Sequence, residues 1–307
     1  MSILDIKNLR KWILLAFVLI LLLFGGACGS RGGNEAETSE ADILIDEAVV
    51  LTIGGDGVEG ETTWTLGKLQ GLGEGYRSVN YSTTNNWPTF GYMAAEGVSL
   101  TYLLRQEAGL LEGAACFKFI STDGYNATLT YDQVFGERYT YAVHSALGSS
   151  GAAIAEPVVA WAWGDDGSVR PENIRSFFGQ IGPWEVNTAS FVKDLCRIEI
   201  STESAGTWET PEASIPDGAV VPSGTELELI HNNMDNLRIY FTLDGSEPDY
   251  DSAVYNPSTS YFQPYLITPL ILEQSVTVKA FAAGHGKDRS SVATFTYTIE
   301  AIETMQN

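Results

Sequence analysis

Cysteine and histidine are scarce in this chain, with three of each among 307 residues. No CxxC or HxxxH pair occurs, and His144, His231 and His285 are scattered along the sequence. Because zinc sites need several such ligands at short, regular spacings, the sequence predicts no metal site of this type. Basic residues are also few: 17 Lys and Arg stand against 39 Asp and Glu, which gives a formal net charge of −22. A surface of this sign repels phosphate backbones, so we expect no nucleic acid as a partner.

Motifs of hydrolytic enzymes are missing as well. No GxSxG elbow precedes a predicted helix, and the many acidic residues single out no carboxylate pair. We therefore name no catalytic residue, and the sequence favours a protein that is not an enzyme.

The N-terminus has the pattern of a secretory signal. Lys7, Arg10 and Lys11 precede an uninterrupted apolar run at 13–24, which is short for a membrane span and is followed by Gly-Gly-Ala-Cys. The alternative is an anchor helix that stays uncleaved. The position of Cys28 resembles the lipobox of bacterial lipoproteins, although Gly25 stands where that family usually has Leu.

The lipobox resemblance implies that residues 1–27 are a signal peptide and that Cys28 is acylated. Residues 28–44, which are small, polar and acidic, would then be a flexible tether. Removal of the signal takes away three positive charges and one negative charge, which leaves −24. We expect an extracytoplasmic protein that is held at the cell membrane by lipid.

The other two cysteines, Cys116 and Cys196, lie in the apolar, strand-like runs ACFKFI and LCRIEI. We predict buried thiols, and one disulfide is the alternative in an oxidising compartment.

The composition changes at residues 201–218, where Ser, Thr, Glu and Pro replace the apolar pattern. We predict a first domain at 45–202, a linker at 203–216 and a second domain at 217–300. In the first domain, strand patterns mix with a few short helices, which indicates an α+β fold around an antiparallel or mixed sheet. Its clearest helix is SLTYLLRQEAG, with Gly109 as the C-terminal cap, and Asp56-Gly57 and Asp123-Gly124 are predicted hairpin turns.

The second domain contains only strand and turn patterns. Alternating apolar residues in RIYFTLDG, SVTVKAFAAG and ATFTYTI predict about seven short strands in a β-sandwich of immunoglobulin-like type. The segment IYFTLDGSEP and the strands that follow it resemble the chitobiase/β-hexosaminidase C-terminal domain, which in that family carries no catalytic residues. Four acidic residues near its turn suggest calcium as an alternative, but they lack the EF-hand spacing, and we favour turn chemistry: Asp244, Glu247, Asp249 and Asp251.

The first domain resembles the molybdopterin-binding domain of the sulfite-oxidase type over about residues 49–200. The resemblance rests on the order of WTLGKLQGL, EGVSLTYLLRQEAGL, KFISTDGYNATLTYDQV, IRSFFGQ and FVKDLCRIEI. In that family, the loop after the strand matching SVNYS supplies a cysteine that binds molybdenum. Here Tyr81, Ser82, Thr83 and Thr84 stand at that place, and Asn85 and Asn86 follow them.

The resemblance implies candidate cofactor-binding residues, among which an arginine and a lysine would suit a phosphate group. The alternative is that they form hairpin turns and surface ion pairs. The candidates are Tyr81, Ser82, Thr83, Asn85, Asp123, Tyr125, Arg175 and Lys193.

Three functions follow from these patterns. The first is a cell-surface binding or interaction module that has lost molybdenum chemistry, which the missing thiol and a signal without paired arginines favour; we expect no cofactor. The second is an active molybdopterin-dependent oxidoreductase that uses a Ser82 or Thr83 hydroxyl as ligand. The third is a factor that binds cell-wall glycan through tryptophans, although the first two of these share a strand face and should pack in the core: Trp161, Trp163, Trp184 and Trp208.

Overall fold

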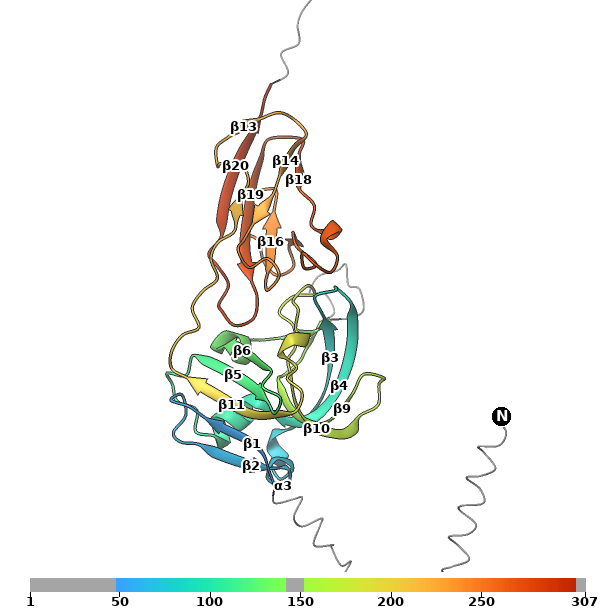
Figure 1. Cartoon of the computed structure of the whole chain (residues 1–307), viewed down its shortest axis with the longest axis vertical. Helices are drawn as coiled ribbons and strands as arrows, with labels where there is room; N and C mark the ends of the chain where they lie inside the picture. Colours follow the sequence, from blue (N-terminus) through green and yellow to red (C-terminus); the bar gives the residue numbers. More distant parts are fainter. Residues whose placement is uncertain (1–47, 142–151, 302–307) are drawn as a thin grey trace, which may run out of the picture. The chain divides into compact units, whose positions relative to one another are not determined.

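Two β-sheets share one hydrophobic core in the first part of the chain (Figure 1). The computed structural model describes residues 48–141 and 152–301. One sheet is mixed, with a parallel β1–β11 pair, and has the order β2 (Thr62–Thr65), β1 (Val49–Gly54), β11 (Leu195–Ser201), β5 (Cys116–Ser121) and β6 (Asn126–Thr130). The other is antiparallel, with the order β10 (Arg170–Phe177), β9 (Val158–Gly164), β4 (Phe90–Ser99) and β3 (Tyr76–Thr84). Two further strands, β7 (Tyr139–Thr140) and β8 (Ala153–Ile154), pair beside them.

The helices of this part are short. They are α3 (Leu66–Gln70), α4 (Leu100–Tyr102) with a π-helical continuation at Leu103–Glu107, and α5 (Tyr131–Phe135). The predicted helix at 99–109 is therefore present but changes from α to π after one turn, and Gly109 ends it with a φ of 65°. The fold is mostly strand, so the predicted α+β class holds only in the coarser sense of a β-rich fold with a few helical turns.

The two predicted hairpins differ in their turns. The β5–β6 pair turns at Asp123-Gly124, with Gly124 at a φ of 89°, as predicted. The β1–β2 pair is also antiparallel, but residues 55–61 join it, which is too long for a two-residue turn. The reason lies in β11: a Cβ on Gly55 would lie 2.0 Å from the carbonyl oxygen of Ile200, and the Asp56 carboxylate accepts a hydrogen bond from the Thr202 backbone at 2.8 Å. The turn is shaped to pack on a third strand.

Beyond residue 211 the regular elements of the described chain are all strands, apart from one 3-10 turn at Pro264–Leu266. Five strands form a sheet in the order β13 (Val220–Val221), β20 (Ala293–Ile299), β19 (Val276–Ala283), β16 (Arg238–Thr242) and β17 (Ala253–Val254). Two short ribbons complete a second core, namely β12 (Glu212–Ala213) with β15 (Leu229–Ile230) and β14 (Thr225–Leu227) with β18 (Leu270–Leu272). The all-strand prediction is confirmed, while the second layer consists of ribbons rather than a full sheet.

The strand register shows whether Cys116 and Cys196 can form a disulfide. Cys116 pairs with Ser201, and Cys196 lies five residues before Ser201 on the same strand, so about 17 Å of strand separates the two positions. A disulfide needs Cα atoms less than about 7 Å apart. Both thiols are free and half-buried, and Cys196 donates to the Ile120 carbonyl at 3.4 Å. The disulfide alternative is wrong, and the thiols are less buried than predicted.

All described residues belong to one compact unit. The α5 residue Gln133 links its two cores: its side-chain amide donates to the Gly284 and Lys287 carbonyls, both at 2.9 Å, and its oxygen accepts from the Gly286 backbone at 3.2 Å. The predicted domain boundaries at 45–202, 203–216 and 217–300 stay a prediction. No helix among the described residues is long and apolar enough to cross a membrane. The predicted signal, Cys28 and the tether lie outside the described residues, as does His144.

Candidate functional site

The candidate residues at the end of β3 are tied into the protein interior. Tyr81 is fully buried, stacks on Phe177 with ring centres 5.4 Å apart, and donates its hydroxyl to the Glu156 carbonyl at 2.5 Å. Ser82 and Thr83 are also buried. The Asn85 side chain closes the β3–β4 turn by accepting from the Trp87 and Thr89 backbones at 3.0 and 2.9 Å. This last contact is the strand-capping role that polar residues commonly take in turns.

Two residues that the sequence did not single out, Gln180 and Asn187, hold this strand end. The Ser82 hydroxyl donates to the Gln180 side-chain oxygen at 2.5 Å, and the Gln180 amide donates to the Thr84 hydroxyl at 3.0 Å. Asn187 donates to the Ser82 carbonyl at 2.9 Å and accepts from the Thr84 backbone at 3.0 Å. The polar groups of the strand end are thus paired with one another inside the protein.

The other four candidates form two groups beside the segment 189–194. Tyr125 donates its hydroxyl to the Ala189 carbonyl at 2.7 Å, and the Asp123 carboxylate accepts from the Tyr125 backbone at 2.9 Å. Arg175 lies over the Trp163 ring at 4.6 Å, and the Lys193 ammonium lies 6.0 Å from the same ring. Arg175 and Lys193 are thus neighbours, joined by an isolated β-bridge, while the cofactor roles of all eight residues stay predictions.

These residues do not fit a molybdenum–pterin group. The metal ligand of that family is a thiolate, and the two thiols of the described chain, Cys116 and Cys196, lie on β5 and β11, in the sheet that does not contain β3. The Ser82 hydroxyl is no free substitute, because it donates to Gln180 and accepts from the Tyr141 backbone at 2.9 Å. Deprotonation of Ser82 would leave its negatively charged oxygen facing the Gln180 side-chain oxygen, with no proton between the two acceptors.

The four acidic residues of the β16 turn do not converge either. Among the residues that the structure describes, no group of three or more His, Cys, Asp or Glu side chains is placed to hold a metal ion. Asp244 accepts from the backbone and hydroxyl of Ser246, Asp249 accepts from the backbone of Asp251, and Glu247 pairs with Lys279. Gly245 has a φ of 78°, so turn chemistry explains this stretch.

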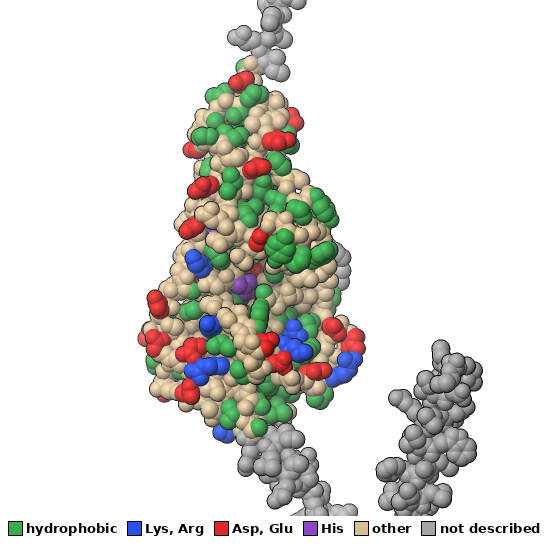
Figure 2. Space-filling model, in the orientation of Figure 1, with side chains coloured by type: hydrophobic (Ala, Val, Ile, Leu, Met, Phe, Trp, Pro, Cys, Tyr) green, Lys and Arg blue, Asp and Glu red, His purple; other side chains and the backbone are tan. Residues whose placement is uncertain are grey.

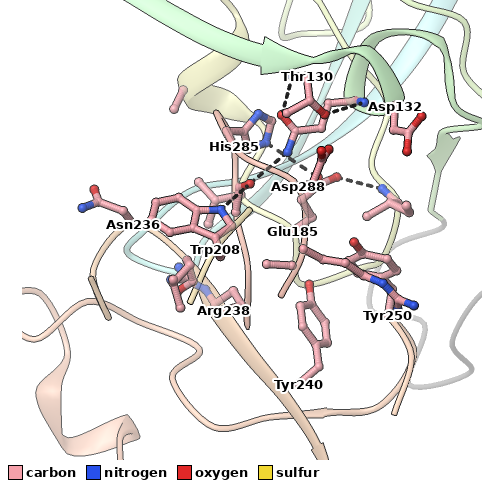
Figure 3. A pocket seen from close by; sticks show the side chains of 18 of the residues that line it. Thr130, Asp132, Glu185, Trp208, Asn236, Arg238, Tyr240, Tyr250, His285 and Asp288 are labelled. Carbon is pink, nitrogen blue, oxygen red and sulfur yellow. Dashed lines mark hydrogen bonds and ion pairs between the residues drawn. The ribbon is translucent and has the colours of Figure 1, made fainter. Parts of the chain in front are cut away.

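A cavity of about 530 Å³ lies where both cores contribute side chains (Figure 3). None of the eight candidates is among the described residues that line it. From the first part come Asn86, Gln133, Arg138, Ile181 and Glu185, and from the rest of the chain come Trp208, Arg238, Tyr240, Tyr250 and His285. A cavity of this volume, with polar groups among aromatic walls, is typical of a small-molecule site.

Glu185 is the central charge of the cavity. Its Oε2 atom accepts from Arg138 Nη1 at 2.7 Å and from the Ile181 backbone at 2.8 Å. Its Oε1 atom faces His285 Nε2 at 3.7 Å, which is too long for a hydrogen bond. Arg138 and Glu185 are both buried, so this is an ion pair out of water. Removal of one partner of such a pair costs about 3–5 kcal/mol of stability.

His285 lines the cavity beside Glu185 but forms no hydrogen bond within the described chain. Both ring nitrogens are buried, and neither has a hydrogen-bond partner. Burial lowers the pKa of this imidazole, an effect that Glu185 and the nearby Val186 backbone oppose and Arg138 reinforces. The ring is therefore held in its neutral form, which offers one donor and one acceptor.

Arg238 is the second unsatisfied group of the cavity. Strand alternation places Ile239 and Phe241 in the sandwich core and Arg238 and Tyr240 on the opposite face. Arg238 is only 3% exposed and donates to the Leu237 carbonyl and to the Asn86 side-chain oxygen, both at 3.1 Å. Its Nε has no partner. Burial lowers the pKa of this guanidinium from its usual range, but not enough to remove the charge.

Sequence reasoning missed this cavity because its residues come from seven separate stretches of the chain. Arg238 gave no signal, because an arginine beside core residues in the strand RIYFT is the ordinary pattern of a strand with one solvent-facing side. Glu185 and His285 lie in loops and carried none.

Four exposed aromatic residues form a surface that we call the aromatic patch: Trp87, Tyr261, Phe262 and Tyr265. Trp87 is 49% exposed and Tyr265 71% exposed. The rings of Trp87 and Phe262 lie 5.2 Å apart, and Gln263 donates to the Trp87 carbonyl at 2.7 Å. Figure 2 shows hydrophobic side chains gathered where the β3–β4 turn and the 260–266 loop lie in Figure 1. The tryptophans of the glycan hypothesis, Trp161, Trp163, Trp184 and Trp208, are instead half-buried.

Comparison with known proteins gives a match to a family model and matches to solved structures. Residues 228–297, less than half of the chain, match the family model Fn3 associated. No curated protein sequence matches the chain. The structure is similar to the crystal structure of the sulfane dehydrogenase SoxCD from Paracoccus pantotrophus, with 11% sequence identity and a TM-score of 0.37 over 83% of this chain and 70% of that chain. At this TM-score the resemblance to molybdopterin-binding domains stays a prediction, as does the chitobiase resemblance.

The depressed pKa of His285 predicts acid-sensitive stability. Because the unfolded chain protonates this histidine at its ordinary pKa of about 6.5 and the folded chain does so only at lower pH, stability is complete above that value and falls as the pH drops below it. We expect the free energy of unfolding to fall less between pH 7.5 and 5.5 in His285→Gln than in the unchanged protein, measured by urea denaturation. Between pH 7.5 and 8.5 the two curves should run parallel, and equal losses on acidification would contradict the assignment.

Proposed function

We propose that this chain is a lipid-anchored extracytoplasmic binding protein that carries no molybdopterin and binds a small polar ligand in the cavity shared by its two cores. The observation that carries the proposal is a set of three buried nitrogens, Nε of Arg238 and both ring nitrogens of His285, which have no hydrogen-bond partner in the described part of the protein. Native proteins satisfy nearly all buried polar groups, so unsatisfied nitrogens around one cavity indicate that a ligand supplies the partners.

The hydrogen bonds at the end of β3 support the loss of molybdenum chemistry. Gln180 and Asn187 engage the strand end at the place where the resemblance expects a metal–sulfur bond. A network of this kind is stable only when all its members are satisfied, and a bound metal would have to break it. The lipid anchor rests on Cys28 and on the apolar run before it, and the extracytoplasmic location follows from both.

Metal analysis and pterin fluorescence on protein extracted from its native membrane test the cofactor part of this proposal. We expect molybdenum far below one equivalent and no pterin emission, because no thiolate is available at β3. The Ser82→Ala variant should give the same background. If the Ser82 hydroxyl were a metal ligand, the unchanged protein would hold molybdenum near one equivalent and the variant would lose it, which is the outcome expected of an active oxidoreductase.

A second candidate function is the binding of cell-wall glycan, and the aromatic patch favours it. Exposed aromatic rings stack on the apolar faces of sugars, and monomeric proteins seldom expose such residues side by side. In this hypothesis, the patch rather than the half-buried tryptophans contacts the polymer.

Sedimentation with insoluble cell-wall polysaccharide tests the glycan hypothesis. We expect the full-length chain to co-sediment and the double variant Trp87→Ala/Tyr265→Ala to stay in the supernatant. Tyr76→Ala is the matched control, since Tyr76 is similarly exposed, at 45%, but lies at the opposite end of β3. Equal sedimentation of all three proteins would show that the aromatic patch does not bind the polysaccharide.

A further inference from the structure

We infer that the cavity recognises an oxyanion, the carboxylate or phosphate group of a small organic molecule, and that the Arg238 guanidinium is its anchor. This inference rests on the proposed function, because it names the chemistry of the ligand in the same cavity. It depends on three features of the site: the unpaired cation, the distribution of the acidic residues, and the second unsatisfied group.

Arg238 is a buried cation with no carboxylate at ion-pair distance, although Asp235 attracts it from farther away. Its two hydrogen bonds go to neutral oxygens, those of Leu237 and Asn86, and it forms no ion pair with any carboxylate in the described part of the chain. A charge taken out of water is costly unless it is paired, so the fold holds this guanidinium at a cost that a bound anion would offset. Guanidinium groups also match the two oxygens of a carboxylate or phosphate in geometry.

The acidic residues around the cavity do not neutralise this position. Glu185 is already paired with Arg138, and Asp235 accepts from the backbone and hydroxyl of Ser260, at 2.6 and 2.8 Å. Asp132 is exposed to solvent. Asp288 also lines the cavity and is half-buried. None of these four carboxylates forms an ion pair with Arg238.

His285 and Tyr240 complete the recognition set. Arg238 and Tyr240 project from the same strand, and Figure 3 shows His285 and Glu185 within the same group of side chains. A neutral imidazole with two unsatisfied nitrogens suits a hydroxyl or amine on the ligand rather than its charged end. The ligand that fits is therefore a small molecule with one anionic end and a neutral polar group, such as a hydroxy acid or a sugar phosphate.

Calorimetric titration of the full-length, detergent-extracted chain tests this inference, with inorganic phosphate, citrate and glucose as probes at constant ionic strength. We expect saturable one-to-one binding of phosphate or citrate and none of glucose. Binding of phosphate alone indicates a phosphate-bearing ligand, and binding of citrate alone a carboxylate. The Arg238→Met variant should bind at least about tenfold more weakly, since it loses a charge-assisted hydrogen bond. The affinity of Arg238→Lys, which keeps the positive charge but loses the paired donors of the guanidinium, should lie between those of the unchanged protein and Arg238→Met.

The matched control is Arg170→Met. Arg170 lies at the start of β10, is exposed, pairs with Asp166 and does not line the cavity. The affinity of this variant should equal that of the unchanged protein. The melting temperature of Arg238→Met without probe should not fall, because the substitution removes an uncompensated charge. Undiminished affinity in Arg238→Met, or no saturable binding of either anion, overturns the inference. Specific binding of a neutral molecule in the cavity would overturn the inference alone and leave the proposed function standing.

Discussion

The buried ion pair between Arg138 and Glu185 is the interaction on which the rest of the site depends. Arg138 donates to the Gln133 and Gly179 carbonyls as well as to Glu185, so one guanidinium holds α5, the end of β10 and the loop after it. Glu185 in turn fixes the Ile181 backbone and turns its second oxygen toward His285. The two charges of this pair compensate each other, and both residues line the cavity. The unpaired nitrogens of Arg238 on β16 and of His285 in the β19–β20 loop line the same cavity.

The segment 180–185 connects the sulfite-oxidase-like sequence pattern to the cavity. Gln180, which belongs to the IRSFFGQ motif of the resemblance, pairs with Ser82 and Thr84 on one side and with the Glu185 carbonyl on the other. Gln180, whose motif suggests a cofactor pocket, here links the end of β3 to the Glu185 segment that lines the cavity. The motif is thus compatible with a structural role, and VNYSTTNNWPTFG at 79–91 ends in a turn whose tryptophan reaches the surface.

Much of the fold was predictable from local patterns, because alternation and turn residues report on contacts near in sequence. The β5–β6 hairpin and the strands of the second part follow from such signals. The parallel β1–β11 pair and the β14–β18 ribbon could not be predicted in this way, because each joins residues far apart in the chain. The cavity is the extreme case: Arg238 and Asn86 meet across 152 positions, and no local period encodes that contact.

The central claim is that the cavity holds a small anionic ligand in the native protein. The most direct measurement is mass spectrometry of the small molecules that are released when the full-length chain, extracted from its native membrane, is denatured. Ala283→Trp is the comparison, because Ala283 lines the cavity and a bulky ring there would fill it. The account predicts one anionic compound near one equivalent from the unchanged protein and its loss from the variant. Release of no compound, or of the same compound in equal amount from both proteins, would contradict it.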